Sequence, residues 1–132
     1  MNLPQDFNPG ESREETFTVE DHHTAYHIGS GDSRVLSTPS MISFMEQVSH
    51  RLLAEKLPDD LLSVGIEVNI RHLAATPVHA RVRVRAELLE VEKNRLLFRV
   101  TAHDQVEKIG EGTHRRAVVE LAWFENRAAE KR

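Results

Sequence analysis

A carboxylate and an imidazole stand at positions where the pattern of the chain favours apolar residues. Glu46 lies at the edge of the apolar stripe of a predicted helix. His72 ends an alternating row of apolar strand residues, Ile66, Val68 and Ile70. Polar groups that face a hydrophobic interior cost stability unless they are paired or used. An acid–base site built on these two side chains is therefore the first hypothesis that the sequence offers.

The residues around Glu46 predict a helix that begins at Thr38 and Pro39. Threonine is a favoured N-cap residue, and proline is favoured at the first helical position. Apolar residues then recur with the period of one helix face, at Met41, Met45, Val48 and Leu52. The helix should end at the segment LPDD (57–60), because a residue before proline disfavours helical backbone.

The spacing of Thr38 and Glu46 limits what these two residues can do together. Eight residues of continuous helix rise about 12 Å, so the two side chains would not touch within one uninterrupted helix. Either the helix begins after Thr38, or the two residues serve different parts of a pocket, or they meet across a dimer.

Period-two alternation elsewhere in the chain predicts five strands. They are expected at residues 14–19, 66–72, 78–88, 96–102 and roughly 106–122. Gly110 and Gly112 interrupt the last of these strands, which indicates a bulge or a close backbone approach. A glycine- and serine-rich loop is expected at 27–37, and residues 1–13 and 125–132 are expected to be loose tails.

This order of elements predicts an α+β protein with one long helix packed on a five-stranded antiparallel sheet. A hot-dog fold is the simplest architecture of that kind. The 132 residues are expected to form a single domain. One helix covers only one face of the sheet, so a second subunit is expected and the protein is predicted to be a homodimer.

The composition excludes several classes of function. The net charge of −4 and the few aromatic residues argue against nucleic-acid binding. The absence of cysteine excludes disulfides, thiolate metal sites and a cysteine nucleophile. The start of the chain, MNLPQDFNPGESREE, does not resemble a signal peptide, and no apolar run is long enough to span a bilayer. A cytoplasmic protein without a membrane partner is expected.

Three segments of the chain together resemble a known enzyme family. They are TPSMISFMEQ, VGIEVNIRHLAATP and TAHDQVEKIGEGTHRRAVVEL. In combination they are similar to the fluoroacetyl-CoA thioesterase family within the hot-dog thioesterases, and the likeness covers roughly residues 35–121. It implies a hot-dog dimer with its active site at the subunit interface, and hydrolysis of a small acyl-CoA thioester to an acid and free coenzyme A.

The resemblance also assigns roles to individual residues. By their place in the motifs, Thr38, Glu46 and His72 match the catalytic residues of the family. Gly65 matches a glycine near the reacting carbonyl, and Arg116 matches an arginine near the mouth of the pocket. The best-known member has bulky aromatic residues just before the threonine, which favour a fluorinated acyl group. Here that segment is GDSRVLS and has no aromatic residue, so the resemblance does not extend to that selectivity.

The residue types suit thioester hydrolysis, which needs neither a metal nor an organic cofactor. Glu46 could attack the carbonyl or activate a water, and His72 could move a proton or stabilise negative charge. Thr38 could hold a water or orient a carboxylate, and a backbone N–H near Gly65 could bind the developing oxyanion. Burial would raise the pKa of Glu46, whereas an imidazolium nearby would lower it.

Other charged residues and other functions remain open at this point. Arg81, Arg83 and Arg85 form a row that is typical of a solvated sheet surface, although guanidinium groups also bind phosphates. Arg116 is the preferred candidate, and on a strand it shares its face with His114. A metal set of His22, His23 and His27 lacks a recognisable ligand pattern, so no metal is expected. A non-catalytic hot-dog module that binds an acyl or aromatic ligand, and a hot-dog dehydratase, are the alternative functions.

Overall fold

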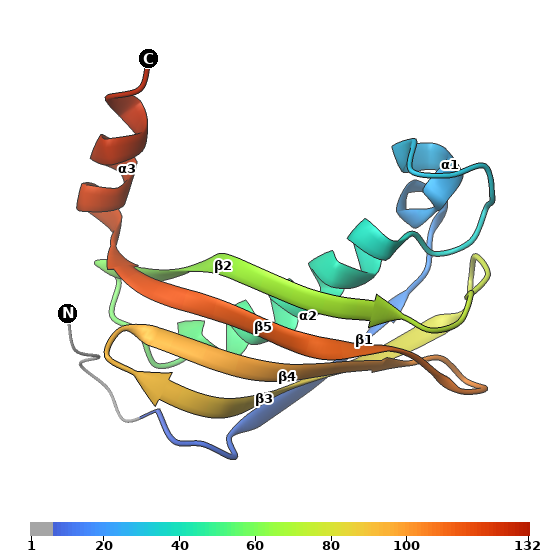
Figure 1. The fold of residues 1–132 in the computed structure, drawn as a ribbon, viewed down its shortest axis with the longest axis horizontal. Coiled ribbons are helices and arrows are strands. Elements are labelled where there is room, and N and C mark those ends of the chain that lie inside the picture. The colour runs from blue at the N-terminus through green and yellow to red at the C-terminus, as the bar shows by residue number, and fades with distance from the viewer. Residues whose placement is uncertain (1–6) are drawn as a thin grey trace.

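A five-stranded antiparallel sheet curves around one long helix in the computed structural model, which describes residues 7–132 (Figure 1). The sheet order is β1-β3-β4-β5-β2. In chain order the elements are β1 (Ser12–Thr18), the 3-10 helix η1 (Asp21–His23), α1 (Ala25–Ile28), α2 (Thr38–Ala54), β2 (Leu61–His72), β3 (Arg81–Glu92), β4 (Arg95–His103), β5 (Lys108–Glu120) and α3 (Leu121–Ala129). The predicted α+β architecture is confirmed.

The long helix α2 begins one residue earlier than the sequence pattern indicates. Ser37 is its N-cap, because the Ser37 side chain accepts a hydrogen bond of 3.1 Å from the amide of Ser40. Thr38 is therefore the first helical residue and not the cap, which leaves its hydroxyl free for another partner. The helix buries an apolar face against the sheet, formed by Met41, Phe44, Met45, Val48, Leu52 and Leu53.

Two neighbouring interior strands, β3 and β4, supply the other half of the core. Their inward side chains are fully buried, whereas the alternate positions are exposed or half-buried, as expected for a sheet that is covered on one face. The buried residues are Val82, Val84, Ala86 and Leu88 of β3 and Leu96, Phe98, Val100 and Ala102 of β4. The predicted row Arg81, Arg83 and Arg85 lies on the exposed face.

A bulge in β2 decides which of its side chains face the helix. Ile66 is an extra residue between the paired positions Gly65 and Glu67. In a regular strand, residues seven positions apart such as Gly65 and His72 would lie on opposite faces. The bulge shifts the alternation by one, so both residues lie on the side of α2. The sequence analysis did not predict this bulge.

Both glycines of the last strand lie where the chain comes very close to its neighbours, as predicted. A Cβ added at Gly112 would lie 2.0 Å from the carbonyl oxygen of Asn69 on β2. A Cβ added at Gly110 would lie 2.5 Å from the Sδ atom of Met41. Gly110 also follows an extra residue, Ile109, at a register shift between β4 and β5. Only glycine fits these close approaches.

The predicted loose tails are wrong for most of the described residues. Residues 1–6 lie outside the described part of the chain. Phe7 is buried, and the first strand begins at Ser12, within the segment that was expected to be a tail. At the other end α3 includes residues 125–129. A hydrogen bond of 2.9 Å from the amide of Leu121 to the carbonyl oxygen of Asp60 anchors the first residue of α3.

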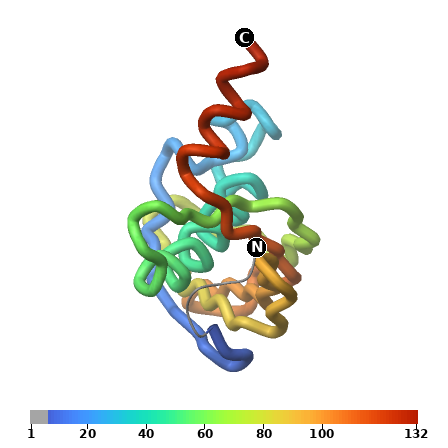
Figure 2. Tube along the Cα trace, turned by 90° about the vertical axis from the view of Figure 1, so that its left-hand side faces the viewer, coloured from blue at the N-terminus to red at the C-terminus, as the bar shows by residue number. Residues whose placement is uncertain are grey.

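β2 forms one edge of the sheet, and two short helices extend past this edge. α3 stands beyond the end where β2 begins, and α1 stands beyond the end where β2 finishes (Figure 1). The end-on view places both helices on the same side of the molecule (Figure 2). Among residues 7–132, no helix is long and apolar enough to cross a membrane.

Candidate active site

Two separate groups of polar side chains lie between α2 and the β2 side of the sheet. We call Thr38 and His72 the threonine–histidine pair. We call the second group the glutamate–arginine cluster; it contains Glu46, Ser63, Gly65, His114 and Arg116. All five residues that the sequence analysis selected fall into one or the other group.

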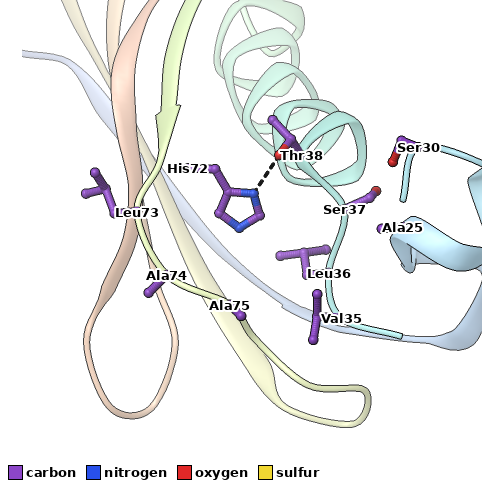
Figure 3. Close-up of a pocket in the computed structure, with 10 residues that line it drawn as sticks. All are labelled: Ala25, Ser30, Val35, Leu36, Ser37, Thr38, His72, Leu73, Ala74 and Ala75. Atoms are coloured by element: carbon purple, nitrogen blue, oxygen red, sulfur yellow. Dashed lines mark hydrogen bonds between the residues drawn. The ribbon is translucent and has the colours of Figure 1, made fainter. Parts of the chain in front are cut away.

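The threonine–histidine pair joins the start of α2 to the end of β2. The hydroxyl of Thr38 and Nδ1 of His72 are 2.8 Å apart and form a hydrogen bond (Figure 3). The pair lines a pocket of about 420 Å³, and the remaining lining residues are Ala25, Ser30, Val35, Leu36, Ser37, Leu73, Ala74 and Ala75. Both side chains thus meet at the wall of a mostly small and apolar pocket.

His72 offers its second ring nitrogen to whatever occupies this pocket. The Nε2 atom is buried, and within residues 7–132 it has no hydrogen-bond partner. Burial lowers the pKa of His72 below its ordinary value, and the backbone of Ala74 opposes this shift. A neutral imidazole with one unpartnered nitrogen is suited to exchange a proton with a bound molecule or a water.

Arg116 is the centre of the glutamate–arginine cluster and is held from several sides. Its Nε donates to Oγ of Ser63 at 2.9 Å, and its Nη2 donates to the carbonyl oxygen of Ser63 at 3.1 Å. Its Nη1 donates to Nε2 of His114 at 3.1 Å and lies 3.7 Å from Oε2 of Glu46. The side chain of Arg116 is only 7% exposed, whereas that of Glu46 is 44% exposed. The buried guanidinium therefore faces a carboxylate that remains accessible.

His114 completes the support of Arg116. Its Nδ1 lies 2.8 Å from the carbonyl oxygen of Glu67 and donates to it, while its Nε2 accepts from Arg116. Burial lowers the pKa of His114 more than any other cause, and the positive charge of Arg116 lowers it further. The ring is therefore a neutral spacer. The sequence analysis placed His114 on the face of Arg116 but gave it no role, and it did not select Ser63.

Gly65 provides the space that the carboxylate of Glu46 occupies. A Cβ added at Gly65 would lie 2.6 Å from Oε2 of Glu46 and 3.2 Å from Cε1 of His114. Any larger residue would therefore displace the carboxylate. This contact brings Glu46 directly against the β2 backbone, near the unpaired edge of the sheet.

The pair and the cluster do not meet within one chain. Thr38 and Glu46 belong to the same continuous helix, eight residues apart, so the first of the three alternatives is wrong. That spacing corresponds to about 12 Å along the axis of α2. Serving different parts of one pocket and meeting across a dimer are the two possibilities that remain.

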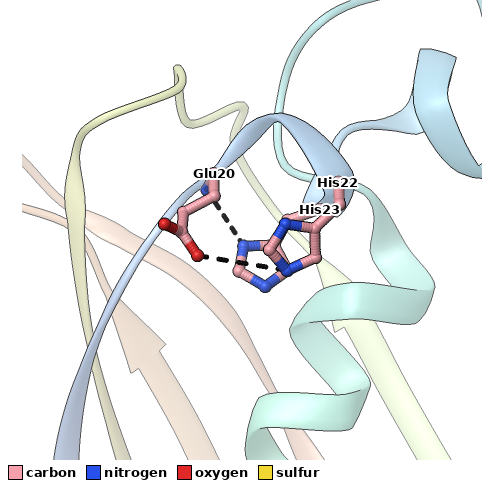
Figure 4. Close-up of side chains that lie close together, drawn as sticks. All are labelled: Glu20, His22 and His23. Atoms are coloured by element: carbon pink, nitrogen blue, oxygen red, sulfur yellow. Dashed lines mark hydrogen bonds and ion pairs between the residues drawn. The ribbon is translucent and has the colours of Figure 1, made fainter.

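The structure brings together a set of metal-ligand types that differs from the histidine set considered in the sequence analysis. Glu20, His22 and His23 have potential ligand atoms within 4.8 Å of one another (Figure 4), and His27 is not part of this group. Nδ1 of His23 accepts a hydrogen bond of 3.0 Å from the amide of Glu20, which caps η1. Because Nδ1 accepts this bond, the proton of neutral His23 is on Nε2. Neither ring nitrogen then has a free lone pair for a metal ion. The group is explained as a helix cap.

The arginine row lies away from both groups. Arg83 forms an ion pair with Glu14 at 3.4 Å, and Arg85 forms one with Glu87 at 3.1 Å. These pairs are exposed on the face of the sheet opposite α2. They match the interpretation of the row as a solvated surface.

Comparisons with known proteins agree with these observations. The family model described as fluoroacetyl-CoA-specific thioesterase matches residues 19–122. A fluoroacetyl-CoA thioesterase from Streptantibioticus cattleyicolor is 38% identical over 128 residues, which cover 92% of each chain.

Solved structures show the same architecture. A crystal structure of a point mutant of a fluoroacetyl-CoA-specific thioesterase has a TM-score of 0.92 and 36% identity, covering 97% of this chain and 99% of that one. A complex of that mutant with fluoroacetate and coenzyme A has a TM-score of 0.86 and 38% identity, covering 89% and 99%. A hot-dog-like protein from Thermanaerovibrio acidaminovorans has a TM-score of 0.88 and 26% identity, covering 95% and 93%. The predicted hot-dog fold is confirmed.

Proposed function

Because the chain belongs to the fluoroacetyl-CoA-specific thioesterase family, we propose that it hydrolyses a small acyl-CoA thioester at a site built by two copies of the chain. One observation carries this proposal. The threonine–histidine pair and the glutamate–arginine cluster hold complementary groups for thioester hydrolysis, but a continuous helix keeps them apart within one copy.

The edge of β2 supports a homodimer. Ile66 and Val68 are 45% and 46% exposed there, and an unpaired strand with apolar side chains is a surface that proteins normally cover. Antiparallel pairing of β2 with β2 of a second copy would extend the sheet across the interface. Gly65 lies near the middle of the strand and His72 at its end, so the same pairing moves Glu46 of one copy toward His72 of the other.

Glu46 acts as the base in this proposal. Its carboxylate takes a proton from a water molecule, and the water oxygen attacks the thioester carbonyl carbon. Arg116 keeps the carboxylate oriented from one side, and the backbone of Gly65 supports it from the other. The carbonyl oxygen becomes negative as the carbon–oxygen bond forms, and a backbone N–H at Gly65 is our candidate donor to that oxygen.

His72 and Thr38 act on the leaving group. Collapse of the tetrahedral intermediate breaks the carbon–sulfur bond and re-forms the carbonyl group. The coenzyme A thiolate leaves as a weak base. The proton that Glu46 took from the water passes to Nε2 of His72, and the ring delivers it to the thiolate sulfur, so the carboxylate and the neutral ring are both restored. The hydroxyl of Thr38 fixes the ring through Nδ1. The reaction consumes one water and yields a carboxylic acid and a thiol, so it requires no metal and no organic cofactor.

The pocket indicates the class of acyl group. Its described lining is made of alanine, serine, valine and leucine side chains together with Thr38 and His72, and includes no phenylalanine, tyrosine or tryptophan. Such a wall accepts a small acyl chain without selecting for fluorine. We therefore propose acetyl- and propionyl-sized acyl-CoAs as substrates, with fluoroacetyl-CoA hydrolysed but not specially preferred. We further propose that the enzyme is cytoplasmic and acts without a nucleic-acid or membrane partner.

Mixed dimers test the shared site. Glu46→Gln and His72→Ala chains are co-expressed with two different affinity tags and purified through both tags. Each homodimer should be inactive, and thiol release from a panel of small acyl-CoAs is measured. If the site is shared, a mixed dimer has one intact site of two, so its activity should be about half that of the wild type.

Two results would contradict the proposal. Inactive mixed dimers would place the whole site within one chain. A wild-type protein that releases no thiol from any member of the panel would overturn the hydrolytic function, and binding without turnover would then favour a ligand-binding module. Formation of an unsaturated or hydrated product without thiol release would favour a dehydratase.

A further inference from the structure

The exposed large hydrophobic side chains gather along one side of the molecule. Among residues 7–132, all of them except Val106 lie on α1, on or directly after β2, or on α3. They are Tyr26, Ile28, Ile66, Val68, Leu73, Leu121, Trp123 and Phe124. Exposed apolar side chains that gather on one side of a molecule indicate an interaction site.

The two helices flank opposite ends of β2. At one end, the amide of Leu121 bonds to the carbonyl oxygen of Asp60, directly before β2. At the other end, Ala25 of α1 lines the same pocket as His72, the last residue of β2. Figure 1 shows both helices rising past the β2 edge, and Figure 2 shows them on one side of the molecule.

A two-fold axis through the middle of β2 would exchange these ends. In a two-fold symmetric dimer, a segment of the first copy that contacts a different segment of the second copy makes a contact that the symmetry repeats with the two copies exchanged. Antiparallel pairing of the β2 edges would therefore bring α3 of each copy next to α1 of the other. Both helices carry exposed apolar side chains there, with Tyr26 and Ile28 on α1 and Trp123 and Phe124 on α3.

We infer that α3 of one copy packs against α1 of the other and holds the wall of its active-site pocket in place. This inference rests on the two-copy site of the proposed function and adds a partner segment to it. Ala25 and Ser30 face the pocket, while Tyr26 and Ile28 are exposed beside them. The C-terminal helix of the partner thus positions a segment that lines the pocket without touching the reacting atoms.

The area required by a stable dimer also favours this arrangement. A specific interface buries about 800 Å² on each partner. A single edge strand with two half-exposed apolar side chains offers only part of that area. Each aromatic side chain that becomes buried adds about 150–250 Å² at most. Tyr26, Trp123 and Phe124 of each copy together account for much of the remainder.

The single tryptophan of the chain reports on this contact directly. Trp123 is the one Trp residue in the sequence and is 57% exposed in one copy. If α3 packs on the partner, Trp123 emission should lie at short wavelength in the wild-type protein and move to long wavelength on dilution into monomers. Tyr26→Ser should weaken dimerisation about tenfold or more and move the emission of Trp123 in the same direction at fixed concentration.

Engineered cysteines identify the partner segment, because the chain has no cysteine of its own. Ile28→Cys combined with Phe124→Cys should give a disulfide-linked dimer on oxidation. Ile28→Cys alone should not give it. Val106→Cys combined with Phe124→Cys is the matched control, because Val106 is exposed on the turn between β4 and β5, and it should also remain unlinked.

The outcomes separate this inference from the proposed function. Short-wavelength emission and cross-linking between positions 28 and 124 support it. A protein that is dimeric by light scattering and hydrolyses acyl-CoA, yet shows exposed Trp123 emission and no such cross-link, overturns the α1–α3 contact and leaves the shared active site standing. A protein that is monomeric at all concentrations overturns both.

Discussion

The threonine–histidine pair and the glutamate–arginine cluster differ in how much of their hydrogen bonding the protein itself satisfies. Thr38 and His72 share one hydrogen bond, and Nε2 of His72 is left unpartnered within the described chain. In the cluster, three nitrogens of Arg116 have protein partners, and His114 is bonded through both ring nitrogens. The first group is left open to a substrate, whereas the second is assembled before any substrate arrives.

This difference indicates how the two groups should respond to mutation. Changes at the open pair should affect turnover and leave the free energy of unfolding almost unchanged. Changes inside the assembled cluster should affect stability as well, because they leave buried donors without acceptors. Glu46 and Gly65 are the exceptions within the cluster, since the carboxylate of Glu46 is accessible and a methyl group at position 65 would meet the flexible end of that side chain.

The largest expected effect is at Glu46. Glu46→Gln keeps the size of the side chain and removes the base, so kcat should fall about 1,000-fold while the thermal unfolding temperature stays close to that of the wild type. Steady-state thiol release and calorimetry measure the two quantities. Glu55→Gln, at the C-terminal end of the same helix, is the control and should keep its activity. A Glu46→Gln enzyme with normal turnover would remove Glu46 from the mechanism.

Substitution of Gly65 should have the next largest effect. The added methyl group of Gly65→Ala would meet the flexible end of Glu46, so we expect a loss of kcat of about 100-fold from misplacement of the carboxylate, with little loss of stability. Gly110→Ala is the contrast, because its methyl group would meet the buried Met41 in the core. It should lower the free energy of unfolding by about 1–3 kcal/mol. Equal activity losses in both variants would refute a special role for Gly65.

The hydroxyl groups of Thr38 and Ser63 offer a matched pair of smaller changes. Thr38→Val removes the partner of His72 Nδ1 and should lower kcat about tenfold, whereas Thr38→Ser should retain most of it. Ser63→Ala removes the acceptor of Arg116 Nε and should cost about 1–3 kcal/mol of stability in urea unfolding. If Thr38→Val proves the less stable of the two, the contrast between the groups fails.

The pH dependence should show the smallest effect. Burial holds the pKa of His72 below the ordinary value of 6.5, so the neutral ring persists below that pH and the acid limb of kcat/KM should lie below pH 6.5. The same lowered pKa means that the unfolded chain binds protons which the folded chain does not. The contribution of neutral His72 to the free energy of unfolding is therefore complete above pH 6.5 and decreases as the pH falls below it. An acid limb above pH 6.5 in the wild type would contradict the neutral ring.

The sequence was sufficient to predict the architecture. Alternation marked the buried residues of β3 and β4, and the helical period marked α2, because burial is strong and regular in these elements. The family resemblance then selected Thr38, Glu46, His72, Gly65 and Arg116. Their placement in two groups matches the helical distance calculated between Thr38 and Glu46.

Local hydrogen bonding was harder to predict. Ser37 and Thr38 are both good caps, and only the observed bond from Ser40 decides between them. Ser63 contacts Arg116 across neighbouring strands, which requires the register of β2 against β5. The C-terminal helix was missed because its polar residues resemble those of a frayed tail, while its anchor at Asp60 lies far away in sequence.

The extra residue in β2 constrains how this protein can change over evolution or in the laboratory. Point substitutions at Ile66 keep the count of residues between Gly65 and His72, and so keep the orientation of both. Loss of Ile66 would remove the bulge and leave the two residues six positions apart, so a regular strand would still place both on the side of α2. Deletion of Ile66 should therefore keep the imidazole beside Thr38, whereas deletion of Asn69, which changes the spacing while the bulge remains, should turn the imidazole to the opposite face and abolish turnover.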